Sequence, residues 1–474
     1  MDILATIAGL LLPWWLGIAV LGALRPRDAS AAAPGDLAWI AGAGYLAGAF
    51  LLTLWMRALS LAGIKFGLAV VAGPLVVAAL ACSYLAWRRS NAPLGATLAG
   101  ALRAIASPPL GGAMRIAWWV LLAWLALRFA LLAVEIGTRP LYPWDAWTQW
   151  ATKARVWYEL GHLAPFARVD AWLAANGTAY FDASPEYPPT MPLLQVWSCL
   201  ALGRWDDTLM NAPWWAIGVA LPLVVYGGLR AWRVEAAAAL VGAFLASSLP
   251  LANTHVALAG YADLPMAAFY TAAALAFLRW SASRSRADAA VALLLAVACT
   301  QIKNPGWFWA ATLLPGLVVV LLPRQGVRVV LIGFAVAALA LVALARFQLS
   351  LFNYQVKLDF NPAWGDLLSS YFLLGNWHLL WYGAIAAALL AWRQLLAPAM
   401  VPLTMVIAGG LLFLFFVFGF TTASFYVSDQ TTVNRATLHL APMIVVFMVV
   451  AWQAFARRWA ERQASLAPAP VAPA

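Results

Sequence analysis

Charged residues are scarce in this chain. Of its 474 residues, 10% are charged and 65% are hydrophobic, whereas a soluble globular chain carries about 25% charged residues. This composition excludes a soluble enzyme, a disordered protein and a coiled coil. It predicts an all-α, polytopic membrane protein, in which each polar side chain kept in or beside the bilayer is costly and therefore informative.

Cysteine is also scarce, and a glycine-rich phosphate-binding loop is lacking. Cys82, Cys199 and Cys299 lie inside apolar segments, which excludes a disulfide framework and a Cys-x-x-Cys metal site. The net charge of +11 comes from Arg clusters at the ends of apolar runs and not from a basic stripe that would bind nucleic acid. The positive-inside rule predicts such clusters at the cytoplasmic ends of membrane spans.

The apolar runs are long enough for about 13 transmembrane helices, since one span needs about 20 residues. If the spans alternate, the Arg clusters all fall on the cytoplasmic side, with the N-terminus outside and the C-terminus inside. The Pro-rich segment 188–202 is too short to cross and is predicted to be re-entrant or interfacial. The expected spans are 3–24, 37–56, 66–87, 116–137, 209–229, 234–253, 264–280, 288–302, 306–322, 329–346, 374–392, 399–420 and 436–456.

Acidic residues gather on the opposite, external side. The external loop 138–208 is the longest stretch without a span and is rich in acidic residues. The cytoplasmic loops are short and almost purely basic. Any chemistry is therefore expected on the external face, where Asp145 directly follows the fourth span.

The segment from Asp145 to Leu160 has apolar residues at helical spacing and predicts an amphipathic helix lying on the membrane. In one interpretation Asp145 only caps this helix, while Lys153 and Arg155 reach lipid phosphates. In the other, Asp145 is a carboxylate held where bilayer meets water, able to deprotonate an acceptor, and the cationic pair holds a lipid phosphate.

Two further external motifs contain carboxylates. Glu186 and Tyr187 precede a run of prolines that starts a rigid helix. Asp263, in Gly-Tyr-Ala-Asp-Leu-Pro, stands at the outer start of an expected span, two residues before a first-turn proline. It is either a simple N-cap or a second external carboxylate close to His255.

Basic residues mark two more places on the external side. Lys303 lies in a polar break between two expected spans, against the positive-inside trend. Arg435 and His439 stand four residues apart, on one face at the outer end of the last span. An Arg at that depth needs an anionic partner, which is either a protein carboxylate or a phosphate.

The order of these motifs resembles that of GT-C-fold glycosyltransferases that use polyprenyl-phosphate sugars, relatives of the protein O-mannosyltransferases and the lipid A aminoarabinose transferase. The motifs are an external Asp, a Tyr-Pro-Pro helix start, Asp-Leu-Pro, a Lys-Asn-x-Gly break and Arg-x-x-x-His-x-x-Pro. The resemblance implies a catalytic membrane domain at 116–456, N-terminal accessory helices at 1–115 and a disordered cytoplasmic tail at 457–474.

The resemblance also implies the roles of residues. Asp145 would be the catalytic base of an inverting displacement. Ala146 replaces the adjacent acidic residue of the mannosyltransferases, so either Asp263 or Glu186 would supply a second carboxylate, or none is needed. Lys153, Arg155, Lys303, Arg435 and His439 would bind the donor phosphate, with Arg435 favoured. Glu186, Tyr187 and His255 would bind sugar or acceptor. The reaction needs no bound nucleotide, and the resemblance leaves undecided whether it needs a divalent metal.

Other classes compete with this interpretation. A transporter or lipid flippase would carry charges near the middle of several spans and paired broken helices. An O-antigen-ligase-like enzyme would depend on external Arg and His residues and would tolerate the loss of Asp145. A structural scaffold would have little reason to keep an Arg435 and His439 pair in a span. The Ala- and Arg-rich composition favours a bacterium with a GC-rich genome, and hence an inner-membrane enzyme with a periplasmic site. Its partners would be a polyprenyl-phosphate donor and a lipid, glycan or protein acceptor.

Overall fold

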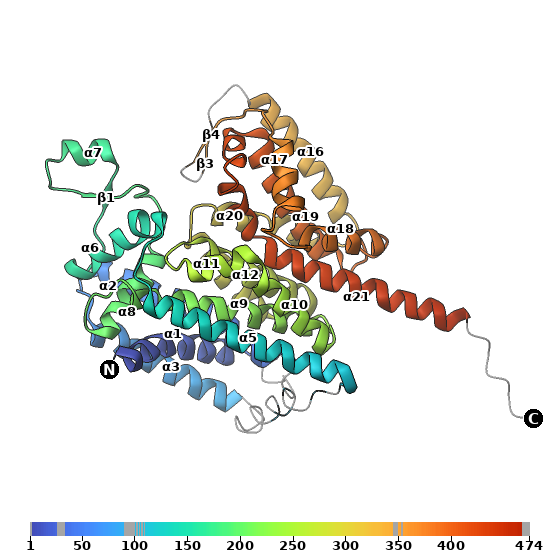
Figure 1. Cartoon of the computed structure of the whole chain (residues 1–474), viewed down its shortest axis with the longest axis horizontal. Coiled ribbons are helices and arrows are strands. Elements are labelled where there is room, and N and C mark those ends of the chain that lie inside the picture. The colour runs from blue at the N-terminus through green and yellow to red at the C-terminus, as the bar shows by residue number, and fades with distance from the viewer. Residues whose placement is uncertain are drawn as a thin grey trace, which may run out of the picture.

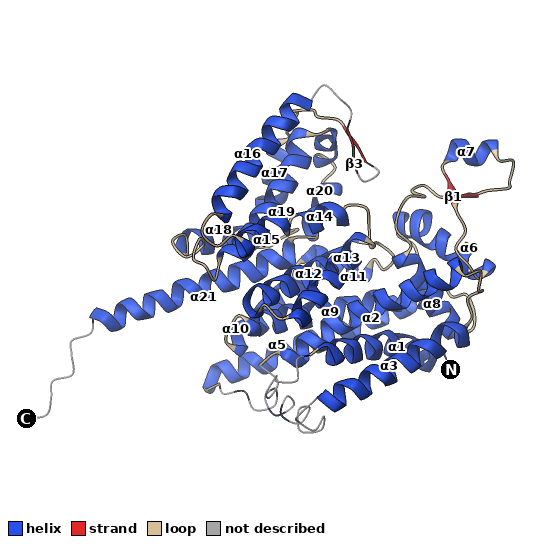
Figure 2. Cartoon of the chain, turned by 180° about the vertical axis from the view of Figure 1, so that it is seen from behind, coloured by secondary structure: helices blue, strands red, loops and turns tan. Residues whose placement is uncertain are grey.

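The computed structural model describes residues 2–25, 34–89, 100, 103, 105, 108, 110–344, 349–351 and 354–466. The protein is 77% helical, and two short two-stranded sheets lie in its loops. One pairs β1 (Phe166–Ala167) in parallel with β2 (Tyr180–Phe181), and the other pairs β3 (Leu349–Leu351) with β4 (Tyr354–Val356) in antiparallel register. The expected all-α membrane fold is confirmed at this level (Figure 2).

The helices of the first half are α1 (Asp2–Leu24), α2 (Asp36–Leu61), α3 (Leu68–Arg89), α5 (Gly112–Thr138), a π-helical turn (Ala146–Ala151), α6 (Thr152–Leu160), α7 (Val169–Ala174), α8 (Thr190–Leu202), a 3-10 turn (Leu209–Asn211), α9 (Ala212–Ala231), α10 (Ala236–Ser248) and α11 (Pro250–Ala257). Those of the second half are α12 (Asp263–Ser283), α13 (Arg286–Thr300), α14 (Gly306–Ala311), α15 (Leu314–Leu321), α16 (Gly326–Leu344), α17 (Trp364–Leu368), a π-helical turn (Ser369–Leu373), α18 (Leu380–Leu390), α19 (Val401–Phe420), a 3-10 turn (Thr422–Val427), α20 (Thr432–Leu438) and α21 (Ala441–Leu466).

Seven helices among the described residues are long and apolar enough to cross a membrane: α1, α2, α3, α5, α9 with the turn before it, α19 and α21. The pair α10 and α11 would add an eighth, but it is bent by 61° at Pro250, whose ring and missing N–H break a helix. The expected number of about 13 is therefore not confirmed. Several expected spans are shorter helices, such as α13 with 15 residues and α18 with 11.

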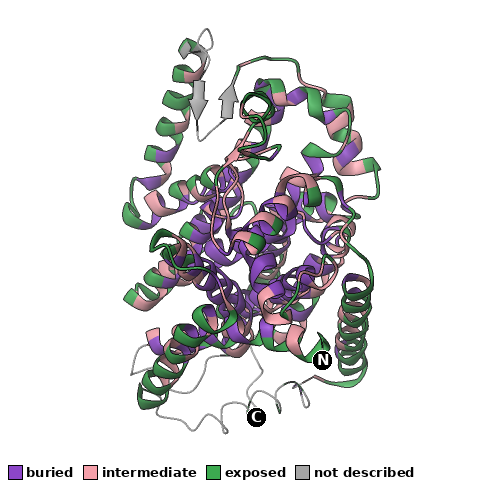
Figure 3. Cartoon of the chain, turned by 90° about the vertical axis from the view of Figure 1, so that its left-hand side faces the viewer, coloured by how far each residue is buried: buried purple, intermediate pink, exposed green. Residues whose placement is uncertain are grey.

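The core is formed by α2, α9 and α12, and nearly every residue of α12 from Asp263 to Leu278 is buried. Figure 3 shows these buried residues gathered in the middle of the protein, with exposed residues on the outer helices. Helices α1 and α2 approach closely, since a Cβ at Gly48 would lie 1.7 Å from the Pro13 carbonyl oxygen. Small residues permit such contacts between membrane helices.

The first three helices pack against the rest of the chain. Arg57 of α2 donates to Gln301 Oε1 at 2.8 Å, and also to Thr190 Oγ1 at the start of α8. The Trp197 indole of α8 donates to the Gly9 carbonyl of α1 at 2.8 Å. The expected division near residue 115 stays a prediction. With 13 residues, α8 is shorter than a span needs, in agreement with the expectation for 188–202.

The expected amphipathic helix after Asp145 forms as the π-helical turn followed by α6, but its apolar face does not lie on lipid. Trp150, Ala154 and Trp157 are buried, whereas Trp147 is 45% exposed. The apolar stripe contacts α8 of the same chain, so protein packing replaces the expected membrane contact. The following loop, which contains β1 and α7, stands away from the other helices at the upper left of Figure 1.

The C-terminal part of the chain also differs from expectation. Helix α21 continues to Leu466, so residues 457–466 of the expected disordered tail are helical. This segment consists mainly of Arg, Ala, Glu and Gln, which are good helix formers. Residues 467–474 lie outside the described residues. Figure 1 shows α21 leaving the helical body toward the C-terminus.

Candidate active site

Asp263 is the centre of a cluster of charged and polar side chains. Its side chain is completely buried at the first residue of α12. Its Oδ1 accepts from Lys303 Nζ at 2.8 Å and from His439 Nε2 at 3.1 Å, and its Oδ2 accepts from Arg435 Nε at 2.7 Å. Since the carboxylate binds these three side chains, the interpretation of Asp263 as a simple helix cap does not describe its role.

Arg435 joins the two carboxylates that the sequence singled out. Its Nε binds Asp263, and its Nη2 lies 2.6 Å from Asp145 Oδ2. Its guanidinium also lies over the Tyr261 ring, 4.7 Å from the ring centroid. Asp145 and Asp263 are thus held on either side of one cation, and the anionic partner expected for Arg435 is, in this structure, a pair of protein carboxylates.

His439 is held in its neutral form with the proton on Nε2. The buried Trp309 indole, which can only donate, points its N–H at His439 Nδ1 at a distance of 2.9 Å. Nδ1 must therefore be the acceptor, and Nε2 carries the proton donated to Asp263. Burial likewise lowers the pKa of His439, although Asp263 opposes this shift.

The charges of the cluster balance. Lys303 and Arg435 contribute two positive charges, Asp145 and Asp263 two negative ones, and His439 is neutral. Yet donors remain: Arg435 Nη1 and two of the three Lys303 N–H bonds have no partner among the described residues. The side chains of Arg435 and Lys303 are 24% and 12% exposed, so an anion that reaches the cluster would find free donors.

The turn before α12 brings the first and third motifs together. Gly260 has a φ of +105°, and a Cβ there would lie 2.5 Å from Ala146 Cβ, so glycine lets the turn approach the residue after Asp145. The Trp214 indole donates to the Tyr261 carbonyl at 2.6 Å and fixes the turn from α9. Burial raises the pKa of the Tyr261 hydroxyl, and the nearby Asp145 charge adds to this.

Arg435 is positioned by its neighbour Asn434, which is 2% exposed. Asn434 Oδ1 accepts from the Trp377 indole at 3.0 Å and from Ser370 Oγ at 2.8 Å. These bonds hold α20 against the segment that follows α17. Arg435 and His439 lie on α20 and on the turn after it, so the last long helix begins at Ala441 and not at residue 436 as expected.

Asp145 keeps one oxygen free. Its side chain is 19% exposed, and it makes no capping hydrogen bond to the helix that follows. No donor among the described residues is bonded to its Oδ1. The capping interpretation of Asp145 is therefore wrong, while its carboxylate remains accessible beside Arg435.

His255 lies at the rim of the cluster, 4% exposed on α11. Its ring meets the Tyr261 ring edge to face, with 5.6 Å between the centroids. Its Nδ1 is buried without a hydrogen-bond partner among the described residues. An unsatisfied buried nitrogen is costly, which supports a role in binding a substrate group.

Lys153 lies outside the Asp263 cluster and binds other residues. It is 1% exposed, and its Nζ donates to Asp182 Oδ1 at 3.0 Å, the Ser184 carbonyl at 2.6 Å and the Gln149 carbonyl at 3.2 Å. Burial lowers the pKa of Lys153 and the Asp182 carboxylate opposes this shift. All three donors are used within the chain, so the structure gives no support to Lys153 as a phosphate ligand. It fastens the external loop to the helix after Asp145.

The other predicted residues of the external loop lie outside the cluster. Arg155 is exposed and pairs with Glu159 at 2.7 Å, one turn away. Glu186 pairs with Arg168 at 3.0 Å. The Tyr187 ring stacks on Trp150 with centroids 5.1 Å apart, which packs the proline motif against the helix that begins beside Asp145. Their predicted binding roles stay predictions.

A divalent metal finds no ready site in the described part of the chain, which contains no group of three or more His, Cys, Asp or Glu that could hold one. In the cluster itself, both Asp263 oxygens already accept hydrogen bonds from Lys303, Arg435 and His439. These donors leave Asp263 unsuited to a cation, and we derive no step through a metal.

Three contributors to the site were not predicted from the sequence. Tyr261 and Asn434 lie within motifs that the sequence singled out but were given no role, and Trp309 lies in an apolar stretch with no motif. Arg128 was missed as well. It lies in the middle of α5, over the Trp124 ring at 5.1 Å, and its Nε has no partner among the described residues. Spans are therefore less free of charge than expected.

Comparison of the chain with models of known protein families, with curated proteins and with solved structures found no match.

Proposed function

We propose that the protein is a membrane glycosyltransferase that moves a sugar from a polyprenyl-phosphate donor to an acceptor on the external side of a bacterial inner membrane. The observation that carries this proposal is the ion-paired group of Asp145, Arg435, Asp263 and Lys303. It joins an accessible carboxylate to cations that have free donors among the described residues. This is the pairing that a base and an anionic leaving group need.

Asp145 is the proposed base. It takes the proton of an acceptor hydroxyl as the acceptor oxygen forms a bond to the anomeric carbon, and the bond from that carbon to the phosphate oxygen breaks. The electron pair leaves with the polyprenyl phosphate, whose charge grows from about −1 to about −2. Attack opposite to the leaving group inverts the anomeric centre.

Arg435 couples the two halves of this step. Its ion pair holds the Asp145 carboxylate beside the guanidinium that would bind the donor phosphate. When Asp145 is protonated, Arg435 loses a negative neighbour at the moment the leaving phosphate gains charge. Arg435 is then free to stabilise the negative charge on the leaving phosphate, which favours the products.

Asp263 is the positioning residue in this scheme. Fully buried and bonded to Lys303, Arg435 and His439, it holds the two cations in place and does not reach the reacting atoms. Neutral His439 adds a hydrogen bond without a further charge. The free donors of Lys303, whose side chain is 12% exposed, serve the donor phosphate together with Arg435.

The proposal is tested by adding purified protein to membrane vesicles that lack it and following release of free polyprenyl phosphate by mass spectrometry. Wild type releases it in proportion to added protein, and the Asp145→Asn variant does not. The matched control Asp170→Asn, an exposed carboxylate on α7, behaves as wild type. Release that is the same with Asp145→Asn as with wild type would refute the base.

A second candidate, a transporter or lipid flippase, is favoured by two observations. Arg128 lies in the middle of α5, where its Nε has no hydrogen-bond partner among the described residues, and α10 and α11 form a broken helix that contacts α5. Both are features of transport proteins. A fluorescent polyprenyl phosphate in proteoliposomes separates the candidates. Movement across the bilayer that is lost with Arg128→Gln and kept with Asp145→Asn would favour transport.

A further inference from the structure

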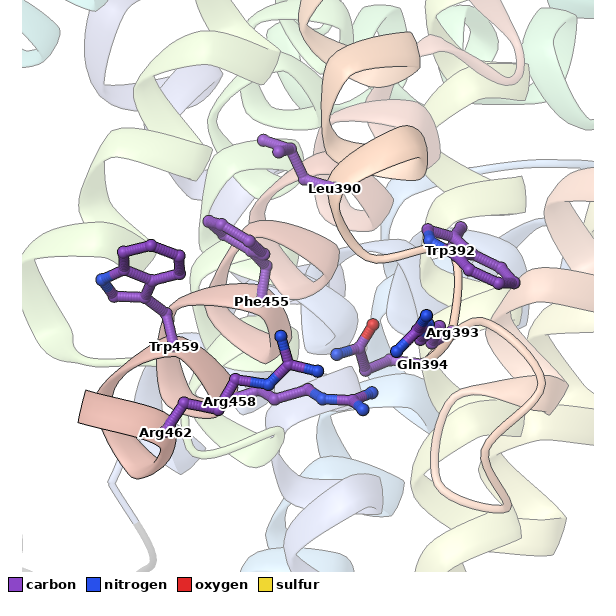
Figure 4. A pocket seen from close by; sticks show the side chains of 8 residues that line it. All are labelled: Leu390, Trp392, Arg393, Gln394, Phe455, Arg458, Trp459 and Arg462. Atoms are coloured by element: carbon purple, nitrogen blue, oxygen red, sulfur yellow. The ribbon is translucent and has the colours of Figure 1, made fainter. Parts of the chain in front are cut away.

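A cavity of about 270 Å³ lies between the segment after α18 and the C-terminal half of α21. Arg393 and Gln394 line it from one side, and Arg458 and Arg462 from the other. Figure 4 shows these polar side chains converging, with Leu390 and Phe455 forming an apolar part of the wall. Its size is close to the lower end for small-molecule pockets, about 300 Å³.

The three arginines have no carboxylate partner among the described residues. Arg458 has one polar neighbour: with the Gln394 amide donating to the Ala391 carbonyl at 2.8 Å, the Gln394 oxygen accepts from Arg458 Nη1 at 3.3 Å. Three like charges around one space repel each other, and an anion between them would remove that cost. Guanidinium groups bind phosphate with two parallel hydrogen bonds.

The depth of the cavity points to a lipid. Helix α21 starts beside His439, and Arg458 follows Ala441 by a helical length of about 26 Å. The hydrocarbon core of a bilayer is about 30 Å thick, so the cavity and the Asp263 cluster lie at opposite membrane surfaces. Trp392 and Trp459, 62% and 55% exposed, flank the cavity, and exposed tryptophans are typical of such surfaces.

We infer that this cavity, the arginine pocket of Arg393, Arg458 and Arg462, binds the phosphate of an anionic phospholipid headgroup. The arginines hold the phosphate, and Leu390 and Phe455 contact the first part of the acyl chains. Basic pockets between membrane helices at the cytoplasmic surface bind anionic lipids in this way. The inference is independent of the proposed transferase activity, since the pocket lies at the other surface.

The test uses full-length protein, stripped of lipid in detergent, and native mass spectrometry with added phosphatidylglycerol or phosphatidylethanolamine. Wild type binds phosphatidylglycerol in preference to the zwitterionic lipid. The double variant R458Q/R462Q binds phosphatidylglycerol at least about tenfold more weakly, because two charge-assisted contacts are lost. The control Arg457→Gln removes one positive charge at the depth of Arg458, on a face where Arg457 donates to the Arg233 carbonyl, and keeps wild-type affinity; its matched single variant is Arg458→Gln.

Three outcomes would overturn the inference. They are equal phosphatidylglycerol affinity in R458Q/R462Q and wild type, no preference of wild type for the anionic lipid, and complete displacement of the lipid by millimolar inorganic phosphate. The last would assign the pocket to free phosphate. The unfolding temperatures of the lipid-free variants show whether they fold. If the double variant does not fold, the single variant Arg462→Gln, at an exposed position, takes its place.

Discussion

Asp145 Oδ2 lies 2.6 Å from Arg435 Nη2, and this ion pair joins the loop after α5 to the segment before the last long helix. The other side of the same guanidinium binds the buried Asp263. In the proposed mechanism Asp145 is the base and Arg435 is the phosphate ligand, so this ion pair joins the two roles. The account therefore predicts different failures when either partner is removed.

Asp145→Asn removes the base and leaves the cations in place. We expect turnover to fall by about 10²–10⁴-fold, the usual contribution of general base catalysis, with donor binding retained. A steady-state transfer assay and a donor-binding measurement on the same preparation separate the two quantities. Turnover within a factor of two of wild type would contradict the assignment and favour a ligase-like enzyme that tolerates this change.

Arg435→Ala removes the shared cation. We expect the affinity for the polyprenyl-phosphate donor to fall at least about tenfold, because a charge-assisted contact to phosphate is lost. The matched control is Arg139→Ala, which removes an exposed Arg paired with Glu135 at the end of α5 and should leave affinity unchanged. Equal losses in both variants would mean that general surface charge, and not the cluster, attracts the donor.

Lys153→Met breaks a buried ion pair and strands the Asp182 carboxylate. The free energy of unfolding in mixed micelles should fall by about 3–5 kcal/mol, as for other buried pairs that lose one partner. Arg155→Gln, which breaks the exposed pair with Glu159 two residues further along, should cost about 0–1 kcal/mol. If the two variants lose equal stability, Lys153 does not anchor the loop as described.

Trp309→Phe removes the indole N–H that faces His439 Nδ1. In wild type, burial lowers the pKa of His439 and Trp309 blocks Nδ1, so the imidazole stays neutral as pH falls through 6.5, the usual histidine range. In the variant Nδ1 is free to take a proton, and the pKa should rise. Nitrogen NMR of labelled histidine at pH 6 reports this, and a neutral His439 in both proteins would contradict the tautomer argument.

The sequence located much of the candidate site because membrane sidedness restricts where polar residues gather. Asp145, Asp263, Lys303, Arg435 and His439 each stand at an end of an apolar run, and alternation of the spans places those ends at one surface. The structure brings all five together. The cost of a lone Arg in a membrane also indicated that Arg435 needs an anion, which the fold supplies.

What the sequence did not indicate depends on tertiary contacts. Lys153 looked like an interfacial cation, yet Asp182, from a distant part of the loop, buries and neutralises it. Trp309 lies in an aromatic apolar stretch where nothing marks it as the partner of His439. The helix count was uncertain for a related reason: hydropathy measures apolar length, and a break such as that at Pro250 divides a run without changing its composition.

The most direct test of the account is native mass spectrometry of the lipid that co-purifies with wild type, Asp145→Asn and Arg435→Ala in mild detergent. Wild type should carry polyprenyl phosphate and its sugar adduct, Asp145→Asn should carry mainly the adduct, and Arg435→Ala should carry neither. The mass of the adduct would identify the sugar. Bulk phospholipid alone in all three proteins would contradict the account and favour the transport alternative.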